Sequence, residues 1–148
     1  MKTFAFRLEQ VLRWRDTQVS LRKSAVAGAA GRLAEIKAMG EALKAELSGA
    51  AARIADGPTG GALGSYAGFR DKSLARIRDS EAQALVAQRT LTLEMNRLME
   101  ARQKLRLLEN LKRTDQDRWR REFDRELAAF ADEAFLCRLQ SKAGRTGA

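Results

Sequence analysis

The fold is decided by residues 8–54, which read LEQVLRWRDTQVSLRKSAVAGAAGRLAEIKAMGEALKAELSGAAARI. One line of mostly apolar residues recurs there at intervals of seven, and a second line follows it at an offset of three. The first line is Leu12, Val19, Val26, Leu33, Gly40, Leu47 and Ile54, and the second is Leu8, Arg15, Arg22, Ala29, Ile36, Leu43 and Ala50. A straight α-helix drifts by about 20° per heptad, so a repeat of this length predicts a helix supercoiled around a partner.

The same chain supplies that partner. The seven-residue interval returns in Ile77, Ala84, Leu91, Leu98 and Leu105. Between the two runs lie the only proline, Pro58, and several glycines, which predict a turn. The sequence therefore predicts an all-α fold, a long two-helix antiparallel coiled coil that forms a single domain over residues 1–148. We expect helix one at about 5–55, a loop at 57–65, helix two at about 66–138 and a disordered tail at 141–148.

The register follows from the position of the turn. If the turn is centred near residue 61, residues that face each other have numbers summing to about 122. Leu47 then faces the neighbourhood of Ala75, and Leu33 that of Arg89. Gly40 stands on the seam itself, where a glycine indicates close approach of the two helices, whereas Gly28 and Gly31 stand off the main line.

The positive charge is concentrated in two stretches. The chain has 28 Lys and Arg against 19 Asp and Glu, a formal net charge of +9. Residues 1–23 and 97–125 contribute +8 of this, and a hairpin brings both to the end that carries the termini. We expect that end to meet an acidic partner.

Several classes of site are excluded by composition. The chain has no histidine and a single cysteine, Cys137, so it lacks the residues of a usual zinc site or of a histidine general base. No glycine-rich nucleotide fingerprint is present. We predict no catalytic site, no cofactor, no metal and no small-molecule substrate, and therefore no enzyme. The lone cysteine and the lack of an apolar leader favour a cytoplasmic protein.

Helix two is expected to run past the end of helix one at about residue 118. The overhang carries an apolar stripe at helical spacing, namely Trp119, Phe123, Leu127, Phe130, Ala134 and Leu136. Such a stripe indicates an external partner, packing against Phe4 and Phe6 of the same chain, or association of the overhang with itself. We favour the external partner.

Three segments resemble the flagellar export protein FliJ family. The opening Phe4-Ala5-Phe6-Arg7-Leu8-Glu9-Gln10-Val11-Leu12-Arg13-Trp14-Arg15 is similar to that family's start. The stretches Leu108-Glu109-Asn110-Leu111-Lys112 and Arg118–Glu126 are similar to its charged C-terminal helix, and Tyr66-Ala67-Gly68-Phe69 to its Tyr-x-x-Phe segment. The order of the segments and the helix–turn–helix layout match over residues 1–140.

The resemblance implies a stalk of the type III export apparatus, associated peripherally with the inner membrane at the flagellar base. Its partners would be the hexameric export ATPase, whose assembly it promotes, a membrane protein of the export gate, and export chaperones. By position, Phe69 matches the family's exposed gate-contacting phenylalanine, while Arg70–Ser73 do not match the rest of that patch. The stem inside the ATPase ring would comprise Phe4, Phe6, Arg13, Arg15, Arg118, Trp119, Arg120, Arg121 and Phe123.

Two alternatives stay open at this stage. A basic coiled coil could serve as a scaffold or bind nucleic acid, although Glu122 and Asp124 interleave the arginines and would repel phosphates. We therefore predict no nucleic-acid partner. The stalk of a virulence-type secretion system would share the same fold, but the Phe4-x-Phe6-x-Leu8-Glu9 opening favours the flagellar branch, and with it a role in motility and chemotaxis.

Overall fold

A computed structural model describes residues 3–57 and 59–145 of the chain. They form two α-helices, α1 (Glu9–Asp56) and α2 (Gly60–Arg145), and no strand occurs among these residues. The chain divides into two compact units, which are considered separately. The hairpin unit comprises residues 17–102, and the terminal unit comprises residues 1–16 with 103–148.

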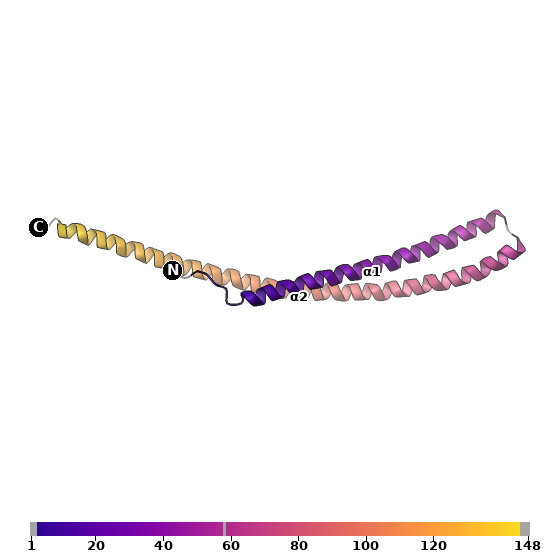
Figure 1. Ribbon diagram of the computed structural model, residues 1–148, viewed down its shortest axis with the longest axis horizontal. Coiled ribbons are helices and arrows are strands. Elements are labelled where there is room, and N and C mark those ends of the chain that lie inside the picture. The colour runs from indigo at the N-terminus through magenta and orange to yellow at the C-terminus, as the bar shows by residue number, and fades with distance from the viewer. Residues whose placement is uncertain (1–2, 58, 146–148) are drawn as a thin grey trace. The chain divides into compact units, whose positions relative to one another are not determined.

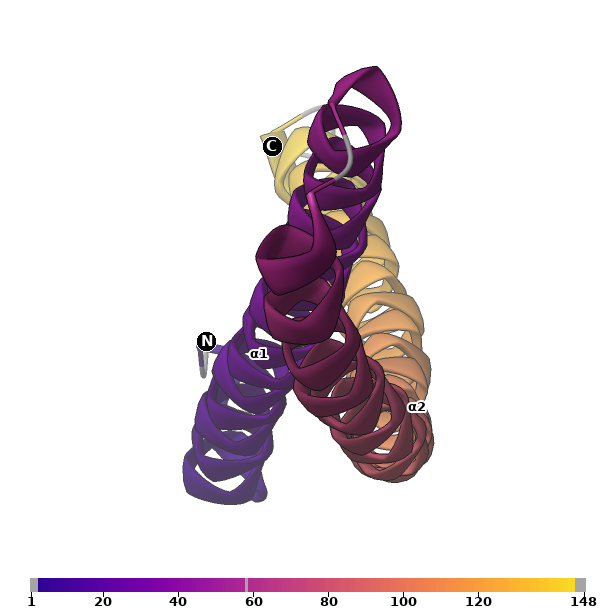
Figure 2. The ribbon, with the colours of Figure 1, turned by 90° about the vertical axis from the view of Figure 1, so that its right-hand side faces the viewer.

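In the hairpin unit, α1 and α2 lie side by side and run in opposite directions, as both views show (Figures 1 and 2). The residues that α1 buries there all belong to the two predicted heptad lines: Val19, Leu33, Gly40 and Ala50. From α2 the buried residues are Ser73, Ile77 and Leu98. The contacting face of the helices, here called the seam, is therefore the one that the seven-residue repeat predicts, and the helical hairpin is confirmed.

The cross-helix contacts confirm the predicted register. A Cβ atom built on Gly40 would lie 2.7 Å from Ser80 Oγ. That hydroxyl donates a hydrogen bond to the carbonyl oxygen of Ile36 at 3.4 Å. Lys44 Nζ lies 3.2 Å from Glu81 Oε1, which together with the charge of Glu41 raises the pKa of Lys44. The residue numbers of the Gly40–Ser80 pair sum to 120 and those of the Lys44–Glu81 pair sum to 125. Both sums are close to the value of about 122 that the position of the turn predicts.

A charged cluster interrupts the apolar seam of the hairpin unit. Glu94 occupies a seam position and its side chain is only 14% exposed. Its Oε1 atom lies 2.7 Å from Arg97 Nη1, and its Oε2 atom lies 3.7 Å from Arg22 Nη1 on the facing helix. Buried polar groups of this kind specify register in coiled coils, because any slip leaves a charge without its partner.

The turn is shorter than the sequence predicts. We expected a loop at 57–65, but α2 already begins at Gly60, and Pro58 lies outside the described residues. The backbone N–H of Leu63 donates to the carbonyl oxygen of Thr59 at 3.0 Å, so Thr59 stands at the N-cap, a position that threonine favours. Ala62 and Tyr66 are half-buried toward α1. Their packing offsets the low helix propensity of the glycines that led to the loop prediction.

The other helix limits also differ from the prediction. Helix α1 begins at Glu9 and not near residue 5, and residues 3–6 form no helix. The backbone N–H of Glu9 donates a hydrogen bond to the carbonyl oxygen of Phe6 at 3.2 Å. Helix α2 continues to Arg145, well past residue 138, so residues 141–145 of the expected disordered tail are helical. Residues 146–148 lie outside the described residues. No glycine or proline interrupts α2 between 69 and 143, which explains its length.

Candidate docking surfaces

An aromatic cluster fills the terminal unit where its two segments meet. The ring of Phe4 is tilted against that of Trp119 at a centroid distance of 6.0 Å, and Trp119 stacks on Phe123 at 5.2 Å. Phe6 is buried, with 8% of its surface exposed. Trp119 therefore packs against the same chain, while docking of this stem to an external partner stays a prediction. The N-terminal segment covers Trp119, which is the alternative that sequence analysis placed second.

An ion pair ties the same segments together. Lys112 Nζ lies 2.7 Å from Glu9 Oε2, which also confirms the antiparallel register in this unit, because the two numbers sum to 121. Arg13 Nε lies 3.9 Å from Glu9 Oε1, and the guanidinium of Arg15 lies over the ring of Trp14 at 4.7 Å. Arg13 and Arg15 thus both contact their own neighbours on α1.

Three further arginines of the predicted stem are unpaired. Arg118, Arg120 and Arg121 are exposed on α2, and none of them forms an ion pair with another described residue. Unpaired guanidinium groups beside aromatic rings are typical of protein interfaces, because they can bind a partner's carboxylates in bidentate fashion. Electrostatically, this surface is suited to an acidic partner.

Beyond the aromatic cluster, α2 exposes an apolar surface, here called the C-terminal apolar segment (residues 127–139). The ring of Phe130 is 71% exposed, the largest value among the exposed large apolar side chains of this segment. The others are Leu127, Phe135, Leu136 and Leu139. Sequence analysis placed three of these on one stripe but missed Phe135 and Leu139. They lie off that stripe, so only the density of apolar residues all around the helix could have revealed them.

A second apolar surface of the terminal unit was not predicted. It comprises Val11, Trp14, Leu107 and Leu111, all of which are exposed. Each of these residues comes one position before a seam residue in the sequence. In an antiparallel helix pair, the residues of both helices that precede seam residues lie along the same edge of the pair. We call this side the preceding flank. Positions that flank the seam of a coiled coil usually carry charged residues. Apolar residues at these positions are therefore the sequence signal that could have revealed this surface.

Phe69 lies in the hairpin unit and is half-buried. It lines a groove of about 370 Å³ with Tyr66 and Ser65 of α2 and with Ala50 and Ile54 of α1. The expectation of an exposed ring is therefore only partly met, because Phe69 occupies a seam position and faces the other helix.

One comparison with known proteins identifies the chain's relatives. The family model described as flagellar FliJ protein matches residues 4–144. The chain belongs to the flagellar FliJ family. Comparisons with curated proteins and with solved structures returned no match. Membership of the FliJ family makes this a flagellar export-related protein of the stalk or adaptor type, a group that is not catalytic.

Two further observations apply to this FliJ family member. Within residues 3–57 and 59–145, no three His, Cys, Asp or Glu side chains gather closely enough to hold a metal ion. Over the same residues, neither helix contains an apolar stretch long enough to cross a membrane.

Proposed function

We propose that this chain is the stalk of the flagellar type III protein export apparatus. Its terminal unit inserts into the hexameric export ATPase and promotes assembly of the ring, and the chain couples the ring to the export gate and to export chaperones. It works in the cytoplasm, associated peripherally with the inner membrane at the flagellar base. Family membership supports the flagellar setting, and the surfaces of the terminal unit support the docking role.

The observation that carries the docking role is the exposure of the C-terminal apolar segment. Phe130 and Phe135 are 71% and 62% exposed, although each could bury more than 100 Å² in a contact. At roughly 25 cal/mol per Å², covering two such rings contributes several kcal/mol to an association. The unpaired arginines lie a few turns earlier on the same helix. An apolar surface inside the ATPase ring, bordered by carboxylates, would complement these exposed rings and arginines.

Ring docking is tested by reconstitution with the purified export ATPase. Phe130→Ser with Phe135→Ser should abolish stimulation of ATP hydrolysis and of hexamer assembly, with an unchanged melting temperature, because neither ring packs inside the chain. Met39→Ser with Leu85→Ser is the matched control, since these side chains are 63% and 62% exposed but lie in the hairpin unit. Stimulation that survives in the phenylalanine variant, or that fails equally in the control, would overturn the proposal.

The gate contact is proposed at the groove that Phe69 lines. An apolar side chain of the gate protein would enter between the helices and pack against Phe69 and Tyr66, with Arg53 and Glu46 at the edge of the groove. Phe69→Ala should weaken binding to the gate protein and leave ATPase stimulation intact. If the variant binds the gate protein as the wild type does, Phe69 serves only to pack α2 against α1.

A further inference from the structure

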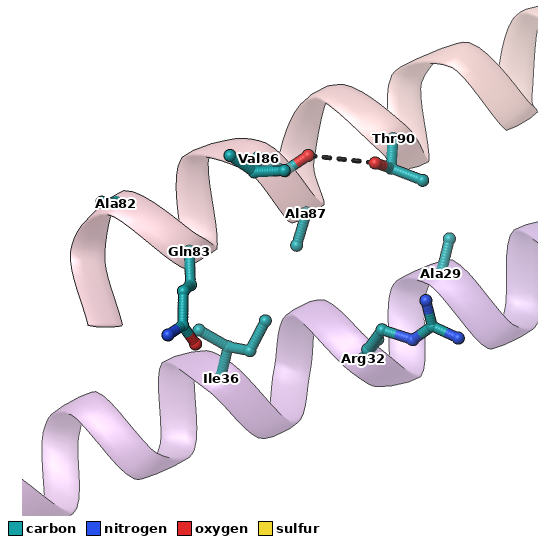
Figure 3. A pocket seen from close by; sticks show the side chains of 8 residues that line it. All are labelled: Ala29, Arg32, Ile36, Ala82, Gln83, Val86, Ala87 and Thr90. Carbon is teal, nitrogen blue, oxygen red and sulfur yellow. Dashed lines mark hydrogen bonds between the residues drawn. The ribbon is translucent and has the colours of Figure 1, made fainter. Parts of the chain in front are cut away.

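A groove runs along the preceding flank of the hairpin unit, far in sequence from the residues assigned above. Its volume is about 420 Å³. It is lined by Ala29, Arg32 and Ile36 of α1 and by Ala82, Gln83, Val86, Ala87 and Thr90 of α2. Figure 3 shows Ala29 and Ala87 pointing from opposite helices into the gap between them, offset along the helix axes. Because both are seam residues with a single methyl group, they leave this stretch of the pair underfilled and the floor of the groove apolar.

Exposed apolar side chains continue the groove along the same flank. Leu21 and Met39 of α1 and Val86 and Leu93 of α2 each stand one residue before a seam position, and all four are exposed. In a two-helix coiled coil these positions border solvent and are usually charged or polar. Apolar residues there are typical of pairs that receive a third helix, whose own apolar stripe covers them.

The charges of the groove indicate what kind of helix would bind. Arg32 is the one charged side chain among its described lining residues. Arg32 is exposed and forms no ion pair with another described residue. A second copy of this chain would bring another net charge of +9 to the groove, which opposes self-association. A helix that carries carboxylates beside its apolar stripe would pair with Arg32 instead.

We propose that this groove binds an amphipathic α-helix of an acidic partner protein, which packs as a third helix along the preceding flank of the hairpin unit. Apolar side chains of the partner fill the space over Ala29 and Ala87 and cover Val86. A carboxylate of the partner pairs with Arg32. The proposal does not depend on docking to the ATPase, because it uses no residue of the terminal unit.

The direct probe is a designed helical peptide of about three heptads, with leucines along one stripe and glutamates beside it. Its twin carries lysine at every glutamate position. Binding of each fluorescently labelled peptide to the full-length protein is measured by anisotropy at low and high salt. The glutamate peptide should bind more tightly than the lysine twin, and its affinity should fall as salt rises. Equal binding of the twins, or no binding of the glutamate peptide, would overturn the proposal.

Matched variants test where the peptide binds. Val86→Glu places a carboxylate in the groove and should weaken binding of the glutamate peptide by at least about tenfold. Leu85→Glu is the control, because Leu85 is equally exposed at 62% but lines a groove on the opposite flank. Arg32→Gln should weaken binding roughly two- to fivefold, whereas Arg89→Gln, at an exposed arginine outside the groove, should not.

Two outcomes of the variant series contradict the proposal. If Leu85→Glu weakens binding as much as Val86→Glu, the peptide does not occupy this groove. If sedimentation shows that the wild type dimerises and that Val86→Glu makes it a monomer, a second copy covers the flank. Because every variant is also assayed with the export ATPase, failure of the groove proposal and failure of the stalk proposal are distinguishable.

Discussion

Replacing Gly40 by alanine tests the packing of the hairpin unit at its closest point. An added methyl group would lie 2.7 Å from Ser80 Oγ, too close for two non-bonded atoms. The hydroxyl must turn away and give up its hydrogen bond to Ile36, at a cost of about 0.5–1.5 kcal/mol. Crowding of the seam adds roughly 1–2 kcal/mol, while the better helix propensity of alanine returns about 0.5–1 kcal/mol. We expect a net destabilisation of about 1–2 kcal/mol.

The assay is chemical unfolding followed by circular dichroism, with two matched variants. Gly31→Ala should stabilise the protein by about 0.5–1 kcal/mol, because nothing lies within 4 Å of the added methyl group. Gly40→Ala combined with Ser80→Ala should recover the lost stability, since the Cβ of residue 80 would lie 3.8 Å away, an ordinary contact. If Gly40→Ala stabilises the protein as much as Gly31→Ala does, the helices do not approach closely at Gly40 and the reasoning is refuted.

Three other predictions concern internal contacts. Trp119→Ala with Phe123→Ala should lower the free energy of unfolding by roughly 2–4 kcal/mol, because it removes the cluster that holds Phe4; an unchanged value would mean that the rings do not pack internally. Arg22→Leu should destabilise the protein by about 1–3 kcal/mol, because Glu94 Oε2 is then buried without its cation. Arg22→Leu combined with Glu94→Leu should recover the stability, and a double variant less stable than the single one would contradict this account. Lys112→Met should weaken protection of the amides of residues 9–12 in hydrogen exchange, through loss of the pair with Glu9, whereas Arg113→Met, at an exposed neighbour, should not.

The seam could be predicted from the sequence because a seven-residue repeat has one geometric solution over so many turns. Val19, Leu33, Gly40 and Ala50 follow directly from it. The antiparallel register followed from the position of the turn alone. The start of α2 did not, because glycines have low helix propensity and only tertiary packing of Ala62 and Tyr66 makes a helix there favourable.

The candidate surfaces were harder to predict, for a different reason. Helical spacing shows that Trp119 and Phe123 share a stripe, but not what covers it. The covering segment, Phe4 to Phe6, is non-helical and carries no helical periodicity that would place it against α2. Apolar residues next to the seam, such as Trp14 and Val86, stand at positions that heptad analysis assigns to solvent. Their exposure becomes evident only once the facing helix is in place.

The central claim, that the C-terminal apolar segment meets the export ATPase, is tested most directly by site-specific photocrosslinking. A benzophenone amino acid is placed at Phe130 or, as the control, at Met39, whose side chain is exposed in the hairpin unit. Each protein is irradiated with the purified ATPase under conditions of ring assembly. The account predicts a covalent product with the ATPase from position 130 and none from position 39. Stimulated ATP hydrolysis without a product from position 130, or equal products from both positions, would contradict it.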